Sequence, residues 1–221
     1  MEFLTGYIHW ISRGTGSMPT QAPEDFVSEQ EYWASEEASP IKHEYFQGRI
    51  YAMEAGSYNH TTIIGNIAAA TKNALHSRTH RSRSSTQRIK VETNGLLTYS
   101  DGVIFPLLSR FEGSGNHTLL TPKVIFEVFS DSTERYDRGD KFRSYAQIES
   151  LTDYVLIDQN RVTVEHFRRT PEGWLLNMYV RRTDSLSLQS IEIELTLDSI
   201  YDELDLPDAV PAILQDHPEV P

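Results

Sequence analysis

Two acidic residues interrupt apolar stretches of this 221-residue chain: Glu127 in "VIFEVFS" and Asp101 in "LLTYSDGVIF". Because side chains alternate along an extended strand, Glu127 shares a face with Ile125 and Phe129. An ionised carboxylate on a buried apolar face is costly, so it normally pairs, protonates or binds a cation. Two carboxylates on neighbouring strands supply the oxygen ligands that Mg²⁺ prefers, with water and a substrate phosphate completing the coordination.

Both acids also have a purely structural interpretation. Asp101 could end its strand with an Asx-turn before Gly102. Glu127 could be neutralised by a basic residue of the segment that follows it: Arg135, Arg138 or Lys141. Helix capping and complementarity to the helix dipole are the favoured interpretation of three further acids in that segment, namely Asp131, Asp137 and Asp140.

Positive charge is concentrated in one interval. The chain has a formal net charge of -12, which argues against a polycation-like nucleic-acid binder. Yet there is no acidic residue between Glu54 and Glu92, and this interval contains six basic residues: Lys72, Arg78, Arg81, Arg83, Arg88 and Lys90. Such a segment could face phosphate groups, although a solvated helix end and loop would explain it equally well.

Several kinds of chemistry are excluded by what the sequence lacks. Without cysteine there are no disulfides, thiolate nucleophiles or cysteine zinc sites. His76 and His80 have an i, i+4 spacing, but no HExxH glutamate lies between them. Neither a GxSxG elbow nor a phosphate-binding GxxxxGK[ST] loop occurs. No apolar run approaches the length of a membrane span and no signal segment opens the chain, so we expect a cytoplasmic protein without membrane contact.

The elements that must position the two acids follow from periodicity and turn residues. Gln47-Gly48 and Asn94-Gly95 indicate two β-hairpins, and Asn59 is the expected N-cap of a helix that extends to about Ser77. The remaining elements are a short helix, a buried strand, a helix, a series of strands and a closing helical turn, at residues 23–35, 123–130, 136–148, 153–181 and 199–204. This order predicts an α/β (α+β) fold with a mixed sheet.

Length and composition indicate one domain, which we place at residues 23–206. Residues 1–22 lack a clean period, and "GSMPT" at 16–20 reads like an expression-vector junction, so this segment is expected to be a tag or a disordered extension. Residues 207–221 are expected to form a flexible tail.

The ordered segments "GRIY", "YNHTTIIGNI", "TYSD", "VIFEVFSDSTERYDRGDKF" and "LTDYVLID" resemble the Uma-two family, within the restriction-endonuclease-like PD-(D/E)XK superfamily of nucleases. The resemblance extends from about Glu24 to Leu204. It implies a central mixed β-sheet flanked by helices, with Asp101 and Glu127 as the two metal-binding carboxylates and Mg²⁺ as cofactor, for which Mn²⁺ could substitute. Ser100 replaces the usual proline, which supplies no ligand.

The resemblance also assigns roles to other side chains. Phe129 occupies the position of the superfamily's lysine, and Lys141, in the following helix, matches the lysine that related proteins carry there instead. Glu44 matches an upstream acid that can join the metal shell. His60 matches the family's histidine, which could contact phosphate, although a hydrogen bond at the helix start explains it too. Gln87 could orient water.

Taken together, these features predict a Mg²⁺-dependent endonuclease that hydrolyses DNA phosphodiester bonds, with Asp101, Glu127, Lys141 and Glu44 as catalytic residues. DNA and a homodimer are expected because most relatives cut DNA, many of them as dimers. The expected nucleic-acid contacts are His60, Lys72, Arg78, Arg81, Arg83, Gln87, Arg88 and Lys90. Two alternatives remain, a catalytically silent nucleic-acid binder of the same fold and a protein-interaction module.

Overall fold

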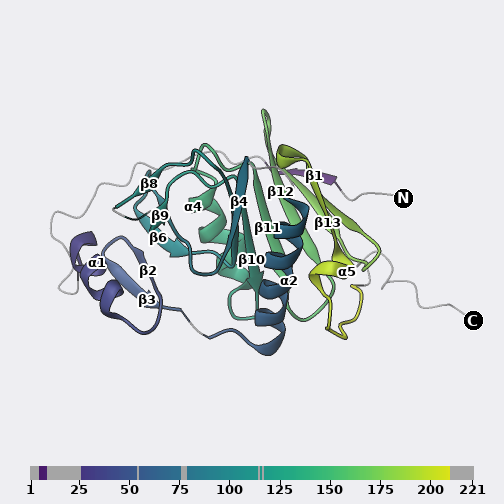
Figure 1. Cartoon of the computed structure of the whole chain (residues 1–221), viewed down its shortest axis with the longest axis horizontal. Helices are drawn as coiled ribbons and strands as arrows, with labels where there is room; N and C mark the ends of the chain where they lie inside the picture. Colours follow the sequence, from purple (N-terminus) through teal and green to yellow (C-terminus); the bar gives the residue numbers. More distant parts are fainter. Residues whose placement is uncertain are drawn as a thin grey trace, which may run out of the picture.

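Two β-sheets make up most of the fold (Figure 1). The computed structural model describes residues 5–8, 26–53, 55–75, 79–113, 115 and 117–209, and for residues 5–8 only the backbone. We call the seven-stranded sheet the central sheet and the six-stranded sheet the second sheet. In this part of the chain, no helix is both long enough and apolar enough to cross a bilayer.

The central sheet has the strand order β1-β13-β12-β11-β10-β7-β4. Its strands are β1 (Thr5–Ile8), β4 (His80–Ser84), β7 (Gly102–Pro106), β10 (Val124–Phe129), β11 (Asp153–Asp158), β12 (Val164–Thr170) and β13 (Gly173–Tyr179). The pair β10 and β11 is parallel, and the other described pairs of this sheet are antiparallel. A parallel pair needs a crossover connection, which the helical segment at residues 134–145 supplies.

The second sheet has the strand order β3-β2-β6-β5-β9-β8. Its strands are β2 (His43–Phe46), β3 (Arg49–Ala52), β5 (Arg88–Val91), β6 (Leu96–Tyr99), β8 (Phe111–Glu112) and β9 (Thr118–Leu119). The turn between β2 and β3 has positive φ at Gln47 (49°) and Gly48 (81°), as a tight hairpin turn of the type I′ kind requires. A separate hairpin pairs β14 (Ser185–Leu188) with β15 (Ile193–Thr196).

Two apolar cores cover the two faces of the central sheet. On one face, Phe126 and Val128 of β10 pack with residues of α2 (Tyr58–Ala74), α5 (Leu197–Ile200) and the β14–β15 hairpin. On the other face, Ile125 and Phe129 pack with the second sheet and with a helical segment formed by α3 (Glu134–Tyr136), the π-helical turn η1 (Asp137–Lys141) and α4 (Phe142–Tyr145). Figure 1 shows α2 lying across the central sheet, while α1 (Glu29–Ala38) lies beside β2 and β3. A short 3-10 turn, η2 (Gln189–Ile191), precedes β15.

The predicted fold class is confirmed, and both hairpins, the buried strand and the series β11 to β13 form where the sequence indicated. The apolar stretch 96–105, which contains Asp101, differs from the expected single strand. It is divided between the two sheets, because β6 ends at Tyr99 in the second sheet and β7 begins at Gly102 in the central sheet. Ser100 and Asp101 therefore lie where the chain crosses from one sheet to the other.

The start of α2 also differs from the prediction. The N-cap is Ser57, whose Oγ accepts a hydrogen bond from the backbone amide of His60 at 3.2 Å. The side chain of Asn59, the expected cap, instead donates to the carbonyl of Gln159 at 3.1 Å. The described helix ends at Ala74. Serine and asparagine are both common N-cap residues. Asn59 is not the cap here, because its side chain is bonded to the carbonyl of Gln159.

Parts of both expected extensions are described. Residues 5–8, within the segment 1–22, form β1 and pair antiparallel with β13. The first helix covers Glu29–Ala38, later in the chain than residues 23–35. Near the other end, Asp208 forms an isolated bridge with Val162. Residues 9–25 and 210–221 lie outside the described part of the chain.

Candidate active site

The antiparallel pairing of β7 with β10 brings Asp101 and Glu127 together. The register pairs Gly102 with Phe126, so the next position places Asp101 opposite Glu127. Residues directly opposite each other in such a pair have neighbouring side chains. Oδ2 of Asp101 accepts a hydrogen bond from the backbone amide of Val128 at 2.8 Å. The carboxylate thus extends the pairing of β10 beyond the point where β7 begins.

Glu127 is 3% exposed. Its Oε1 lies 3.0 Å from Nζ of Lys141 and accepts a hydrogen bond from the hydroxyl of Tyr145 at 2.9 Å. Burial raises the pKa of Glu127, the charge of Lys141 lowers it, and the carboxylates of Asp101 and Asp137 raise it again. The net result is a pKa well above the usual range, with burial as its largest cause.

Lys141 connects several acids. Besides Glu127, its Nζ lies 3.5 Å from Oε1 of Glu44 and 3.6 Å from Oδ1 of Asp137. Burial alone lowers the pKa of Lys141, but the surrounding acids, Glu127 first, outweigh it and hold this pKa well above the usual range. Lys141 is therefore an ammonium ion. We call Asp101, Glu127, Glu44, Asp137 and Lys141 the acidic cluster. The ammonium of Lys141 lies 3.0 to 3.6 Å from three of its four carboxyl groups, and the fourth, that of Asp101, contacts His60 instead.

The π-helical turn η1 positions the ends of this cluster. It begins at Asp137 and ends at Lys141, and both side chains are buried on the side of Glu127. The hydroxyl of Tyr154, on β11, donates to the backbone carbonyl of Asp137 at 3.0 Å. Burial raises the pKa of Asp137, against the lowering effect of Lys141. Short π-helical turns inside α-helices occur frequently at functional sites.

Glu44 reaches the cluster from the second sheet. Its Cα partner on β3 is Tyr51, and the hydroxyl of Thr98 on β6 donates to its Oε1. Its Oε2 accepts a hydrogen bond from the hydroxyl of Tyr136 at 3.0 Å. The second sheet therefore holds Oε1 of Glu44 through Thr98, while the helical segment holds Oε2 through Tyr136 and contacts Glu44 again through Lys141.

His60 contacts the other side of the site. Its Nε2 lies 3.3 Å from Oδ2 of Asp101, and its Nδ1 is buried without a partner among the described residues. Burial lowers the pKa of His60, but the hydrogen bond and charge of Asp101 outweigh it and raise the pKa. The backbone of Gly56 packs closely on this ring, because a Cβ atom at Gly56 would lie 2.3 Å from Nδ1.

Phe129 is part of the core and contributes no charge to the site. It is buried in the same apolar cluster as Phe142 and Tyr145, and the guanidinium of Arg138 lies 4.7 Å from its ring centroid. Arg138 is itself paired with Glu165. The ammonium that contacts Glu127 therefore comes from the helical segment, at Lys141.

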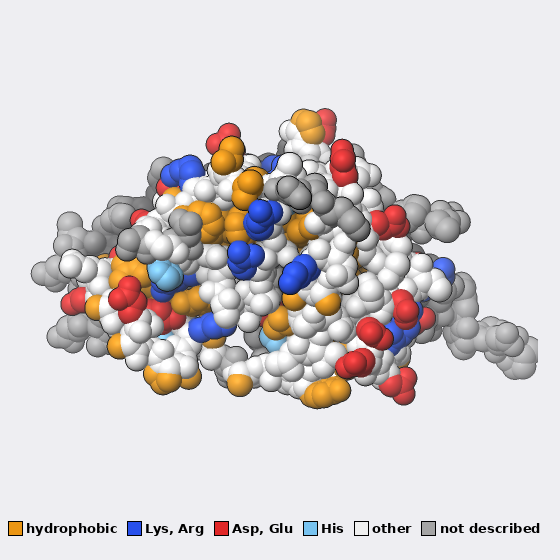
Figure 2. All heavy atoms as spheres, viewed as in Figure 1, with side chains coloured by type: hydrophobic (Ala, Val, Ile, Leu, Met, Phe, Trp, Pro, Cys, Tyr) orange, Lys and Arg blue, Asp and Glu red, His pale blue; other side chains and the backbone are white. Residues whose placement is uncertain are grey.

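The first half of the basic interval is largely open to solvent. Lys72 is exposed on α2, and on β4, the described edge of the central sheet, Arg83 is exposed and Arg81 is half-buried. Figure 2 shows lysine and arginine side chains gathered over the middle of this face, where Figure 1 places β4 and α2, with acidic side chains around its margins. Arg78 and His76 lie outside the described residues.

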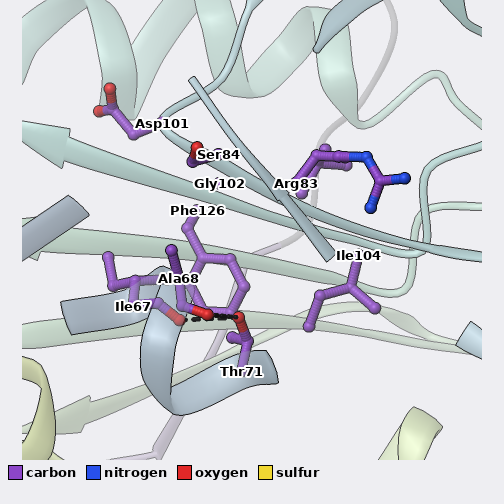
Figure 3. Close-up of a pocket in the computed structure, with 10 residues that line it drawn as sticks. Ile67, Ala68, Thr71, Arg83, Ser84, Asp101, Gly102, Ile104 and Phe126 are labelled. Carbon is purple, nitrogen blue, oxygen red and sulfur yellow. Dashed lines mark hydrogen bonds between the residues drawn. The ribbon is translucent and has the colours of Figure 1, made fainter. Parts of the chain in front are cut away.

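A small pocket lies between β4, β7 and α2 (Figure 3). Apolar side chains such as Ile67, Ile104 and Phe126 form much of its lining, with Asp101 and Arg83 at its border. In Figure 3, the carboxylate of Asp101 and the guanidinium of Arg83 point in different directions. The pocket therefore borders the acidic cluster at Asp101, and Arg83 does not point toward that carboxylate.

The second half of the basic interval is arranged differently from the predicted phosphate-facing surface. The guanidinium of Arg88 is buried 4.2 Å from the ring centroid of Trp33. Nζ of Lys90 pairs with Glu29 at 2.5 Å and with Glu112 at 3.0 Å. The side-chain amide of Gln87 donates to the carbonyls of Arg88 and His117, at 3.2 and 3.0 Å. These three residues stabilise the second sheet, so we remove them from the predicted nucleic-acid surface.

Sequence reasoning missed four members of the site. Asp137 was assigned to helix capping, yet it is buried beside Lys141, and the i, i+4 spacing of the pair was the available signal. The other three are Tyr136, Tyr145 and Lys42. Nζ of Lys42 donates to the carbonyl of Ser85 at 2.5 Å; burial lowers its pKa, and the nearby charge of Asp101 opposes this effect.

The cluster fits a small divalent cation by its chemistry. Glu127 contacts Lys141 and Tyr145 through Oε1, and Asp101 contacts Val128 and His60 through Oδ2. Among the described residues, no group of three His, Asp or Glu side chains forms a ready metal cage. Mg²⁺ commonly takes only one or two carboxylates, with water and substrate phosphate as its other ligands. Two opposed carboxylates with a deficit of positive charge suit that mode of binding.

Comparisons with known proteins identify the family and a solved structure with a similar fold. The Uma2 family, described as "Putative restriction endonuclease", matches residues 29–199. Two proteins of Synechocystis sp., both described as uncharacterised, are similar: slr1290 is 34% identical over 81% of this chain and 94% of its own length, and sll1609 is 28% identical over 72% and 90%. A crystal structure from Anabaena variabilis, described as "a putative nuclease belonging to DUF820", has a TM-score of 0.64 and 16% identity, covering 78% of this chain and 96% of that one.

Proposed function

This chain belongs to the Uma2 family, and we propose that it is a divalent-metal-dependent endonuclease that hydrolyses phosphodiester bonds of DNA. The observation that supports this proposal most strongly is the acidic cluster. Burial raises the pKa of Glu127, and the acids around it raise it further against a single lysine. A cation between the carboxylates would remove that deficit.

In this proposal, Asp101 and Glu127 hold Mg²⁺, or Mn²⁺ in its place. The ion supplies Lewis-acid activation of water and neutralises charge on the scissile phosphate. Lys141 keeps its ammonium next to Glu127, where it stabilises negative charge that develops on the phosphate. Glu44 fixes Lys141 from the second sheet, and His60 orients Asp101. Phe129 is buried in the apolar core on the same face of β10 as Glu127.

Binding of the DNA backbone is assigned to the basic group of Lys72, Arg81 and Arg83. Within this group, Arg83 pairs with Val103 near the start of β7 and borders the same pocket as Asp101, whereas Arg81 pairs with Phe105 and Lys72 lies near the C-terminal end of α2. The group would offset the chain's net charge of -12 locally, and its contribution to binding would weaken as salt rises. A homodimer remains a prediction, which sedimentation equilibrium tests.

A plasmid assay tests the function. Supercoiled DNA is incubated with the full chain in EDTA, Mg²⁺ or Mn²⁺, and nicked and linear products are quantified. Asp101→Asn, Glu127→Gln and Lys141→Met are each compared with Asp140→Asn as the matched control. Asp140 neighbours Lys141 in sequence, but its side chain is 76% exposed and pairs with Arg143, so its charge is removed outside the cluster.

We expect metal-dependent nicking by the wild type and by Asp140→Asn, and none by the three cluster variants. Cleavage that persists in both Asp101→Asn and Glu127→Gln would contradict the proposed site. Calorimetric Mg²⁺ or Mn²⁺ binding without any cleavage would favour the silent nucleic-acid binder, for which the buried Phe129 is the observation in favour. Absence of both metal binding and cleavage would favour a protein-interaction module.

A further inference from the structure

A strip of aromatic and basic side chains lies beside the acidic cluster. We propose that Arg49, Tyr51 and Tyr136, which we call the β3 strip, bind an unpaired strand of nucleic acid and direct it to the cluster. The inference rests on the proposed function and deepens it, because it makes single-stranded or locally unpaired DNA the preferred substrate.

Two tyrosine rings flank Glu44. Tyr51 is its Cα partner in the β2–β3 hairpin, so the two side chains are neighbours on one face of the second sheet. Tyr136 approaches from the helical segment and donates its hydroxyl to Oε2 of Glu44 at 3.0 Å. Its ring centroid lies 6.0 Å from Nζ of Lys141. Tyr51 therefore lies beside Glu44, which contacts Lys141, and Tyr136 lies beside both Glu44 and Lys141.

Both rings are also open to solvent. Tyr51 is 49% exposed and Tyr136 is 38% exposed, whereas Glu44, between them, is buried. Exposed aromatic side chains are the surfaces on which proteins stack the bases of single strands. The hydroxyl of Tyr136 is held by Glu44, which fixes the ring in place and leaves its outer part available.

Arg49 adds a positive charge to the strip. Side chains two residues apart on a strand share a face, so Arg49 lies on the same face of β3 as Tyr51. It is exposed, and β3 is the described edge of the second sheet. An exposed arginine next to an aromatic ring is the combination with which proteins bind single strands, by a phosphate contact and by stacking.

The strip suits an unpaired strand better than a duplex. In a continuous duplex the base faces are covered by their neighbours, so tyrosine rings gain nothing by stacking, whereas every unpaired base offers an open face. The acids are also recessed, with Glu127 almost fully buried and the Asp101 side chain 14% exposed. An extended single strand can enter such a recess more easily than a double helix can.

The test measures binding of fluorescein-labelled oligonucleotides by anisotropy, in EDTA so that no cleavage occurs. We compare a single strand, a blunt duplex and a duplex with a single-stranded tail. We expect the full-length wild type to bind the single strand and the tailed duplex about tenfold more tightly than the blunt duplex. Equal or tighter binding of the blunt duplex would overturn the inference, even if plasmid cleavage establishes the proposed function.

Variants separate the ring from its hydroxyl. Tyr51→Leu and Tyr136→Leu should each weaken single-strand binding by about fivefold or more, since one stacked base is lost. Tyr136→Phe should retain the affinity, because the ring remains. Arg49→Ala should weaken binding, while Arg110→Ala should not, because Arg110 directly precedes β8 at the opposite edge of the same sheet. Circular dichroism checks that each variant is folded, and unchanged binding in both folded leucine variants would overturn the inference.

Discussion

Glu127 and Asp153 are both buried acids on neighbouring strands, β10 and β11, yet their surroundings differ. Asp153 accepts hydrogen bonds on both oxygens: Oδ1 lies 2.7 Å from Nε2 of His166, and the hydroxyls of Ser190 and Thr152 donate to Oδ2 at 2.5 and 2.8 Å. Burial raises the pKa of Asp153, but these hydrogen bonds, that of His166 first, outweigh it and lower the pKa. The pKa of Glu127 moves in the opposite direction.

The difference teaches that burial alone does not identify a functional acid. Asp153 has enough donors of its own and shares them with no other carboxylate among its contacts, so it is a satisfied structural group. Glu127 shares one ammonium with Glu44 and Asp137, and lies opposite Asp101. Buried carboxylates that share too few positive charges in the folded protein are the ones expected to bind a cation.

The largest expected effect is on catalysis at the unbalanced site. Glu127→Gln should reduce plasmid cleavage by at least about 100-fold, because it removes a metal ligand. Its free energy of unfolding should not fall, because the amide no longer competes for Lys141. Asp153→Asn should leave cleavage per folded molecule unchanged. Steady-state cleavage rates and urea unfolding of the same preparations check both expectations. A lower stability of Glu127→Gln in EDTA would contradict the charge deficit.

Substitution of Asp153, whose carboxylate has a full set of hydrogen-bond donors, should affect stability rather than cleavage. Asp153→Ala should lower the free energy of unfolding by about 3 kcal/mol, because it leaves His166 buried without its carboxylate. Urea denaturation followed by tryptophan fluorescence measures this change. Thr152→Val serves as the control that removes one hydroxyl donor and leaves the His166 contact intact. If Asp153→Ala lost less free energy of unfolding than Thr152→Val, the pair with His166 would contribute little to stability.

The two acids also predict opposite pH dependences in the metal-free protein. The folded pKa of Asp153 lies below its unfolded value, so its contribution is present above the unfolded pKa and is lost as the pH falls through the folded pKa. The folded pKa of Glu127 lies above its unfolded value, so its contribution is present below the unfolded pKa and is lost as the pH rises through the folded pKa.

Urea midpoints in EDTA between about pH 2 and pH 8 measure this difference. Glu127→Gln should gain stability relative to the wild type as the pH rises. The stability advantage of the wild type over Asp153→Asn should shrink as the pH falls below the unfolded pKa of Asp153. A gap between Glu127→Gln and the wild type that stays constant with pH would show that Glu127 keeps a normal pKa.

The smallest effect tests the histidine of the candidate site. Gly56→Ala places a Cβ atom 2.3 Å from Nδ1 of His60, so the ring must move and its contact with Asp101 should loosen. We expect cleavage to fall by about three- to tenfold. Gly65→Ala is the matched control, because a Cβ atom there meets nothing within 4 Å; it should stabilise α2 by about 1 kcal/mol without changing cleavage.

Much of the fold could be predicted from local patterns. Alternation and turn residues indicated β2, β3, β10 and the strands after it, because these signals depend on residues close in sequence. The split of residues 96–105 between two sheets could not be predicted in this way. Both halves are apolar and extended, and only tertiary pairing decides which sheet each one joins.

The site shows the same limit. Glu127 and Asp101 were visible as acids in apolar strands, but Asp137 and Arg88 were not distinguishable by type from surface residues. Asp137 is buried because η1 turns it toward Lys141, and Arg88 is buried because Trp33 lies over its guanidinium. Both facts depend on partners distant in sequence or on a helical irregularity, which periodicity does not report.

The crossing at Ser100 and Asp101 has a consequence for when the site exists. Glu127 belongs to the central sheet, Glu44 belongs to the second sheet, Asp101 lies in the crossing between them, and Lys141 contacts acids from both sheets. The complete site is therefore present only while the two sheets are docked. When the second sheet has not formed or has detached, the chain contains the same acids, but they are not brought together into one site. If the proposed function holds, such a molecule would not cut DNA, and cleavage would begin only when folding is complete.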